Sequence, residues 1–312
     1  MKTIVTSYNL LAIIGPTASG KTSVAAHWAY RNGSEIISAD SRQVYRGMTI
    51  GTGKDYADYV VNGLPVPYHC IDIVDAGLQY NVYEYQKDFL RAYNDIVCRG
   101  KMPVLCGGSG MYIEAAINGY QLIQTPVNEE LRKELDKKTD EELETKLAGL
   151  KTLHNRSDTD TRKRLVRAIE IAVYQSEIGQ TNNDYPIIRP LLVGVKYDRE
   201  SRRKRITQRL RQRLDQGLIE EAKGLLDNGL TPEQLEYYGL EYKYLAKYLT
   251  NELSYSQMFE QLNIAIHQFA KRQMTWFRRM ERNGATIWWL DGYLPMEEKL
   301  REIDAALLKS NY

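Results

Sequence analysis

Short apolar runs alternate with longer stretches of helical periodicity along the first third of the chain. Glycine, proline or polar residues bound each run, as is typical of buried strands, and helical patterns lie between them at about 22–30 and 83–98. The strands expected over the whole chain are Leu10–Ile14, Glu35–Ala39, Pro103–Cys106, Leu191–Val195 and Ala285–Leu290. This alternation predicts an α/β fold in which helices flank a parallel sheet.

The pattern changes between residues 125 and 185. Charged helix-forming residues replace the strand formers, and leucines recur as a narrow apolar stripe at 131, 135, 143, 147 and 150. Either Asp158 or Asp160 can cap a further helix, whose buried face is Leu165, Ile169, Ala172 and Val173. We therefore predict a helical insertion over 125–185. It separates the first part of the core, 1–124, from the remainder, 186–312, which holds basic helices and the final strand.

Two long helices are expected late in the chain, a basic one at Arg202–Leu226 and another at Tyr255–Arg282. Overall, 42 basic residues face 40 acidic ones, so the net charge of +2 does not by itself indicate a polyanionic partner. The local distribution is more informative, because eight of the fifteen residues from Arg199 to Arg213 are basic. Two further basic clusters occupy 162–167 and 271–282. Such clusters suit contacts with nucleic-acid phosphates, although each alone also fits a solvated helix face.

Composition narrows the class of protein. The chain has 312 residues, 43% hydrophobic and 26% charged, which is ordinary for a folded globular protein. The run Leu10–Ile14 is too short to cross a bilayer and leads into a glycine-rich turn, so we expect neither a membrane span nor a signal peptide. Three cysteines without zinc-site spacing favour a reducing cytoplasm.

The strongest motif is GPTASGKT, Gly15 to Thr22, which matches the phosphate-binding loop pattern G-x-x-x-x-G-K-[ST]. A predicted strand precedes it and a helical pattern follows it, as this loop requires. Backbone N–H groups of such a loop surround a phosphate, and the helix N-terminus adds partial positive charge. Lys21 supplies a full positive charge, and Thr22 supplies a hydroxyl ligand for Mg²⁺.

The molecule that carries the phosphate is not fixed by this motif. A nucleotide kinase or NTPase would normally have a second strand that ends in an aspartate metal ligand. The strand Pro103–Cys106 is followed by Gly107, Gly108 and Ser109 instead, whereas Glu35–Ala39 is followed by Asp40. Since ligands bind at the carboxyl ends of parallel strands, Asp40 is either a metal anchor or a base directed at a second substrate; a structural cap is a weaker alternative.

Six blocks, taken in order, resemble those of the bacterial tRNA dimethylallyltransferases, also called tRNA isopentenyltransferases. They are GPTASGKT, ISADSRQVYRGMTIGTGK (37–54), VLCGGSGMYI (104–113), DTRKRLVRAIE (160–170), DRE with RITQRL (198–210) and AKRQMTWFRR (270–279). The resemblance implies a P-loop NTPase-like core and transfer of a dimethylallyl group from its diphosphate to N6 of the adenosine 3′ to the tRNA anticodon. The loop then binds a diphosphate rather than ATP, which accounts for the missing second acid.

The resemblance also implies roles for individual residues. Asp40 is the general base, and Ser109, where the family usually has Thr, and Lys21 assist catalysis. The diphosphate contacts are Gly15, Thr17, Ala18, Ser19, Gly20, Lys21, Thr22, Arg205 and Arg209. The tRNA contacts are Asp40, Ser41, Arg42, Gln43, Ser109, Arg132, Arg164, Arg167, Lys271 and Arg272. Thr22 holds Mg²⁺, and the expected partners are the tRNA anticodon stem-loop and dimethylallyl diphosphate, bound by a cytoplasmic monomer with no membrane partner.

Some positions depart from the family pattern. Ala and Pro are usual where Gly53 and Asp55 stand, Leu or Tyr where Arg202 and Arg203 stand, and Met where Arg213 stands. Two rivals remain at this point. One is a prenyltransferase that acts on free adenine nucleotides, against which the basic clusters argue. The other is a nucleotide kinase or nucleotide-dependent RNA-binding switch, against which the missing second acid argues.

Overall fold

The computed structural model describes residues 6–150, 161–178 and 185–309 and divides the chain into two units. The α/β unit comprises Met1–Gly119 and Ile187–Tyr312, and the helical unit comprises Tyr120–Pro186. The helical unit thus occupies the part of the sequence in which we expected an insertion over 125–185.

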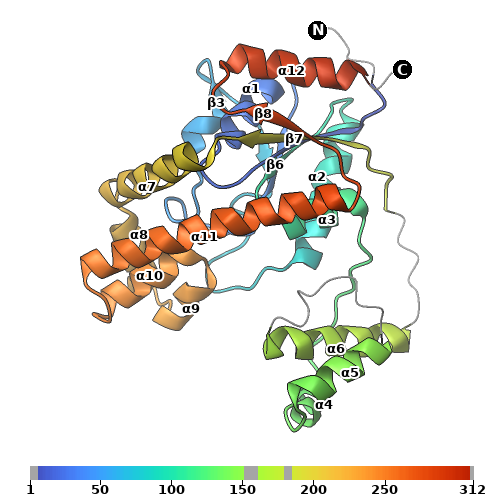
Figure 1. The fold of residues 1–312 in the computed structure, drawn as a ribbon, viewed down its shortest axis with the longest axis vertical. Helices are drawn as coiled ribbons and strands as arrows, with labels where there is room; N and C mark the ends of the chain where they lie inside the picture. The colour runs from blue at the N-terminus through green and yellow to red at the C-terminus, as the bar shows by residue number, and fades with distance from the viewer. Residues whose placement is uncertain (1–5, 151–160, 179–184, 310–312) are drawn as a thin grey trace. The chain divides into compact units, whose positions relative to one another are not determined.

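The described residues of the α/β unit form a six-stranded, all-parallel sheet with the order β5-β2-β6-β1-β7-β8 (Figure 1). The strands are β1 Leu10–Ile14, β2 Ile36–Ala39, β5 Tyr68–His69, β6 Val104–Gly107, β7 Pro190–Lys196 and β8 Ile287–Asp291. The predicted parallel sheet is confirmed. β5 and the hairpin of β3 (Val60–Val61) and β4 (Leu64–Pro65) were not predicted, because two residues are too few to show a periodicity.

Helices cover both faces of this sheet (Figure 1). One face carries α1 (Lys21–Asn32) and α12 (Met296–Leu308), whose Val24, Trp28 and Ile303 pack with strand residues into one hydrophobic core. The other face carries α2 (Val82–Cys98), α3 (Gly110–Asn118) and α11 (Tyr255–Arg282). Because all six strands are parallel, their carboxyl ends lie at one edge of the sheet. The loops after β1, β2 and β6 lie next to one another there, since these strands are neighbours.

The predicted basic helix Arg202–Leu226 is wrong as a single element. The chain forms α7 (Arg199–Asp215) and α8 (Leu218–Asp227), which are separated at Gly217. Gly217 has φ 99°, a left-handed conformation that glycine adopts readily and that ends an α-helix. The short helices α9 (Pro232–Tyr237) and α10 (Leu240–Leu249) follow, and α11 begins and ends as predicted.

The helical unit contains α4 (Glu129–Leu135), α5 (Asp140–Leu150) and α6 (Arg162–Ile178). Its small core joins leucines from α4 and α5 to the predicted face of α6. Leu150 is an exception, since it was expected on the apolar stripe but is 39% exposed at the end of α5. The proposed caps Asp158 and Asp160 lie outside the described residues.

Candidate active site

The loop Gly15–Thr22 runs from the end of β1 to the start of α1 and has the backbone of an anion-binding turn. Ala18 and Gly20 have positive φ values, 61° and 76°, which turn successive N–H groups toward one side. A Cβ on Gly15 would lie 2.8 Å from both Ser19 Oγ and Val195 O, so only glycine fits there. The Ser19 hydroxyl is buried without a hydrogen-bond partner among the described residues. This hydroxyl is therefore an unused donor that a phosphate can engage.

Lys21 is the first residue of α1 and extends its ammonium group back over this loop. Its Nζ donates a hydrogen bond to Pro16 O at 3.4 Å. Burial lowers the pKa of Lys21, whereas the negative charge of Asp40 acts in the opposite direction. A buried ammonium group of this kind is stabilised by an anion placed next to it.

Asp40 follows β2 at the same edge of the sheet. Its Oδ1 accepts a hydrogen bond from the backbone N–H of Arg42 at 2.9 Å, which fixes the carboxylate relative to the loop. Among the described residues, Asp40 forms no ion pair. One carboxylate oxygen thus remains available to accept a proton from a bound substrate.

Ser109 lies beside Asp40 because β2 and β6 are adjacent. Its Oγ accepts a hydrogen bond from the N–H of Ser41 at 3.2 Å, and its own N–H donates to Ala39 O at 3.2 Å. The preceding Gly107 allows this approach, since a Cβ there would lie 2.2 Å from Ala39 O. The structure therefore brings Asp40, Ser41 and Ser109 together, as predicted from two separate sequence blocks.

Arg42 and Gln43 point in different directions. The guanidinium of Arg42 lies 5.1 Å from the centroid of the Tyr237 ring, an aromatic side chain that is 38% exposed. The amide of Gln43 is used inside the protein: its Oε1 accepts from Ser38 Oγ at 2.9 Å, and its Nε2 donates to Gly53 O at 3.0 Å. In this structure Gln43 holds the loop that carries Gly53.

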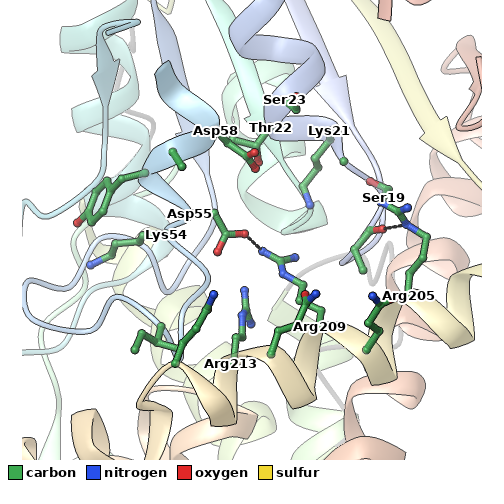
Figure 2. A pocket seen from close by; sticks show the side chains of 18 of the residues that line it. Ser19, Lys21, Thr22, Ser23, Lys54, Asp55, Asp58, Arg205, Arg209 and Arg213 are labelled. Atoms are coloured by element: carbon green, nitrogen blue, oxygen red, sulfur yellow. Dashed lines mark hydrogen bonds and ion pairs between the residues drawn. The ribbon is translucent and has the colours of Figure 1, made fainter. Parts of the chain in front are cut away.

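A cavity of about 700 Å³ opens beside the phosphate-binding loop (Figure 2). Residues 18–23, the loop at 49–58 and one face of α7 line it. From α7, Arg205 Nε donates to Ala18 O at 3.0 Å, and Arg209 forms an ion pair with Asp55. Both arginines predicted for the diphosphate thus face the loop across the cavity, and the Asp55–Arg209 pair was not predicted.

The cavity also offers oxygen ligands that suit Mg²⁺. The hydroxyl-bearing Thr22 lines it together with Asp55 and Asp58. Burial, and then the charge of Asp55, raise the pKa of Asp58, so a cation beside these carboxylates would be favourable. The described residues hold no cluster of three or more His, Cys, Asp and Glu side chains. Mg²⁺ usually takes one or two protein ligands together with phosphates and water.

Comparison with known proteins identifies the family. The sequence profile of IPP transferase matches residues 43–280, and that of isopentenyl transferase matches residues 8–67. The chain is 58% identical to tRNA dimethylallyltransferase 1 of Parabacteroides distasonis, over 94% of this chain and 96% of the relative. The chain belongs to the tRNA isopentenyltransferase family. The resemblance inferred from the six sequence blocks is confirmed.

Other matches agree with this family and with its fold. Another relative is tRNA dimethylallyltransferase 2 of Bacteroides fragilis, 55% identical over 96% of this chain and 98% of the relative. The crystal structure of a tRNA isopentenylpyrophosphate transferase from Bacillus halodurans has a TM-score of 0.71 at 31% identity and covers 98% of each chain. A eukaryotic dimethylallyltransferase acting on tRNA, 22% identical with a TM-score of 0.74 over 92% of this chain and 74% of its own, shares the fold. The predicted P-loop NTPase-like core is thereby confirmed.

Gln273, in the KRQMTW block of this family member, was not singled out from the sequence. It is buried, and its amide connects the phosphate-binding loop to the residues after β6. Its neighbours Lys271 and Arg272, which were predicted to contact tRNA, are exposed on α11. The sequence offered only a weak signal, an uncharged glutamine directly after two cations, and the burial that requires internal partners for its amide is seen in the structure.

In the helical unit, two predicted tRNA-binding arginines already have a protein partner. Arg132 and Arg167 both form ion pairs with Glu170, whose carboxylate is buried. Each of the two arginine side chains remains more than one-third exposed. Arg164, on the same helix as Arg167, is exposed. This cluster stabilises the unit by giving a buried carboxylate the charge compensation that it requires.

Proposed function

We propose that this protein transfers a dimethylallyl group from dimethylallyl diphosphate to N6 of the adenosine 3′ to the anticodon in tRNA and releases diphosphate. The observation that carries this proposal is the position of Asp40. It lies at the same edge of the sheet as the phosphate-binding loop, with one carboxylate oxygen free among the described residues. A base for the acceptor and a cradle for the leaving group are thus adjacent in a member of this family.

The acceptor half of the reaction depends on Asp40. Adenine N6 is a weak nucleophile because its lone pair is delocalised into the ring. As the bond from N6 to C1 of the dimethylallyl group forms, an N6 proton becomes acidic, and the Asp40 carboxylate accepts it. The N–H of Arg42 holds the carboxylate in place, and Ser109 holds the adjoining Ser41.

The donor half depends on the loop and α7. While the C1–O bond breaks, its electron pair passes to the departing diphosphate, which gains negative charge. The loop N–H groups, Lys21, Arg205 and Arg209 surround the cavity in which this charge develops. Mg²⁺ bound by Thr22 would supply further compensation of the diphosphate charge. Preorganised donors of this kind lower the barrier because they need no reorganisation during the reaction.

Basic side chains on α7 and α11 suit an RNA acceptor. Arg202 on α7 lies close enough to Arg278 on α11 for electrostatic effects, since the charge of Arg278 contributes, after burial, to the lowered pKa of Arg202. Such a surface positions a phosphate backbone. The target adenosine must leave its stack to reach Asp40, which favours the single-stranded anticodon loop over a duplex.

The working form of the protein is expected to be a cytoplasmic monomer. Within the described part of the chain, every helix is too short or too polar to cross a lipid bilayer. We expect tRNA to be bound at the basic surface of α7 and α11.

Mass spectrometry of nucleosides tests this proposal. Unmodified tRNA is incubated with the protein, Mg²⁺ and dimethylallyl diphosphate, and N6-dimethylallyladenosine is expected next to the anticodon with release of one diphosphate per modification. Parallel reactions replace tRNA by AMP or the prenyl donor by ATP. Modification of AMP but not of tRNA would establish the free-nucleotide prenyltransferase instead, and phosphate release from ATP would favour a nucleotide-hydrolysing protein.

A further inference from the structure

Arg213, on α7, is a buried cation that has too few hydrogen-bond acceptors within the described part of the protein. The residue is only 9% exposed, and its Nε has no hydrogen-bond partner among the described residues. Its charged partner, Glu241, is distant, with Arg213 Nη1 lying 3.5 Å from Glu241 Oε1. A strong charge-assisted hydrogen bond is shorter than this, and a buried guanidinium normally uses most of its five donors. Buried N–H groups without a protein partner indicate a place where an acceptor from a ligand can bind.

The guanidinium lies at the donor cavity. Arg205, Arg209 and Arg213 are spaced four residues apart, so they project from one face of α7, and all three line the cavity with Lys21. Figure 2 shows Arg213 beside Arg209, directed from α7 toward the loop that carries Asp55. Arg213 also lines a small recess against Thr17 and Ala18 of the phosphate-binding loop.

Gly53 makes room for this side chain. A Cβ at Gly53 would lie 2.1 Å from Arg213 Nη2, far inside van der Waals contact. Any larger residue there would displace the guanidinium from its present position. Gly53 is held in place by Gln43, whose Nε2 donates to its carbonyl oxygen.

Positive charges outnumber negative charges among the residues that line the cavity, which favours an additional anion. Burial lowers the pKa of Arg213, the adjacent charge of Arg209 lowers it further, and Glu241 only partly offsets these effects. Asp55 forms its ion pair with Arg209, and its charge, like those of Glu241 and Asp40, offsets the lowered pKa of Arg213 only in part. Two neighbouring guanidinium groups in a partly enclosed cavity repel each other unless an anion with several oxygens lies between them.

We propose that Arg213 is a third arginine of the diphosphate-binding site and that Gly53 determines whether the site can use it. This inference rests on the proposed function, in which the cavity holds the diphosphate of the prenyl donor. Arg213 binds oxygens of the diphosphate both in the donor and in the released product. It therefore contributes to affinity for the diphosphate group, while Asp40 acts on the acceptor.

Calorimetric titration with inorganic diphosphate, at a fixed Mg²⁺ concentration, tests the inference directly. Arg213→Met retains much of the side-chain volume and removes the charge, and we expect it to weaken binding about tenfold or more. Arg213→Met/Glu241→Gln removes the buried acid as well, so it avoids an unpaired carboxyl group, and we expect the same loss. Gly53→Ala keeps every charge but displaces the guanidinium, and it should also weaken binding. Arg211→Met, on an exposed position of the same helix, is the matched control and should bind normally.

The affinities of the variants for diphosphate decide between a binding role and a merely structural role of Arg213. Loss of affinity in both Arg213 variants, with the double variant melting near the temperature of the unmodified protein, supports the inference. Unchanged affinity in the double variant overturns it, because Arg213 would then serve only to neutralise Glu241. Unchanged affinity in Gly53→Ala overturns the role given to Gly53. If the unmodified protein fails to bind diphosphate, the proposed function falls together with this inference, whereas normal binding with unaffected variants overturns the inference alone.

Discussion

Gln273 Oε1 accepts a hydrogen bond from the backbone N–H of Thr17 at 2.8 Å, although 256 positions separate the two residues. The other end of the same amide, Nε2, donates to Gly108 O at 3.0 Å. A Cβ on Gly108 would lie 2.5 Å from that nitrogen, so the glycine permits the contact. A single α11 side chain therefore links the phosphate-binding loop to the segment that carries Ser109, and so joins the two sides of the proposed site.

Gln273→Glu should impair both stability and use of the prenyl donor. A carboxylate cannot donate to Gly108 O, and it places a negative charge beside the loop that binds diphosphate. We expect the free energy of unfolding to fall by about 1–3 kcal/mol and kcat/KM for dimethylallyl diphosphate to fall by roughly tenfold or more. Urea denaturation and steady-state kinetics measure the two effects. Gln261→Glu, an exposed position on the same helix, is the control; equal behaviour of the two variants would contradict the linking role of Gln273.

The sequence predicted the parts of the fold that depend on local pattern. Buried strands, the phosphate-binding loop and α11 each carry their own periodicity or motif, and they lie where expected. The break at Gly217 was missed because a lone glycine inside a helical pattern is compatible with a continuous helix. Its left-handed conformation is decided by how α7 and α8 pack.

Contacts between distant segments could not be predicted from the sequence pattern. The proximity of Asp40 and Ser109 follows from strand order, since β2 pairs with β6, and the family resemblance supplied it. The Asp55–Arg209 pair, the internal bonds of Gln43 and the bridge made by Gln273 depend on side-chain positions that no periodicity encodes. Such partners are found only when the folded chain is known.

Asp40→Asn should separate catalysis from binding. Asparagine retains an oxygen that accepts from the Arg42 N–H, so the loop keeps its shape, but the neutral amide cannot take the N6 proton. We expect kcat to fall about 10²- to 10⁴-fold while the Kd for tRNA changes little. Single-turnover kinetics and filter binding provide the two values. Weakened tRNA binding with normal turnover would refute the assignment of Asp40 as the base.

Lys21→Ala should act on the prenyl donor. The ammonium group is buried over the loop, and its removal takes a full positive charge from the cavity proposed to hold the diphosphate. We expect kcat/KM for dimethylallyl diphosphate to decrease by about 100-fold with an unchanged Kd for tRNA. Lys223→Ala, an exposed position on α8, controls for the general loss of a lysine. Unaltered kinetics in Lys21→Ala would show that the loop takes no part in the reaction.

Basic residues on the surface of α7 should contribute to the salt dependence of tRNA binding. Arg203 is exposed beside Arg202, and Arg203→Glu removes a positive charge from a surface suited to phosphates. We expect weaker binding at low salt and a plot of log K against log[salt] that is flatter by about one unit. Arg301→Glu, exposed on α12, makes the same change in net charge at another position and should leave the slope unchanged. Identical slopes for the two variants would make the α7 surface an ordinary solvated helix face.

Because of Glu35, the free energy of unfolding of the α/β unit should decrease at acidic pH. The carboxylate is 5% exposed, and it lies within 2.8 Å of His69 Nε2, Arg99 Nη2 and Lys101 Nζ. Burial by itself raises the pKa of this carboxyl, but hydrogen bonds from Lys101, His69 and Arg99 outweigh burial and lower the pKa from 4.5 to about 2. A group whose pKa is lower in the folded state stabilises the protein above its unfolded pKa, and this stabilisation disappears as pH falls from about 4.5 toward 2.

The expected contribution of Glu35 near neutral pH is about 3 kcal/mol, since each pKa unit corresponds to about 1.4 kcal/mol. Urea denaturation between pH 7 and pH 3 should show the unmodified protein losing part of this advantage on acidification. In Glu35→Gln, the free energy of unfolding should be lower at pH 7, and the gap to the unmodified protein should narrow below pH 4.5. Glu298→Gln, an exposed position on α12, should show neither effect. A gap that stays constant over this pH range would mean that the Glu35 side chain stabilises the sheet edge through its shape and hydrogen bonds rather than through its charge.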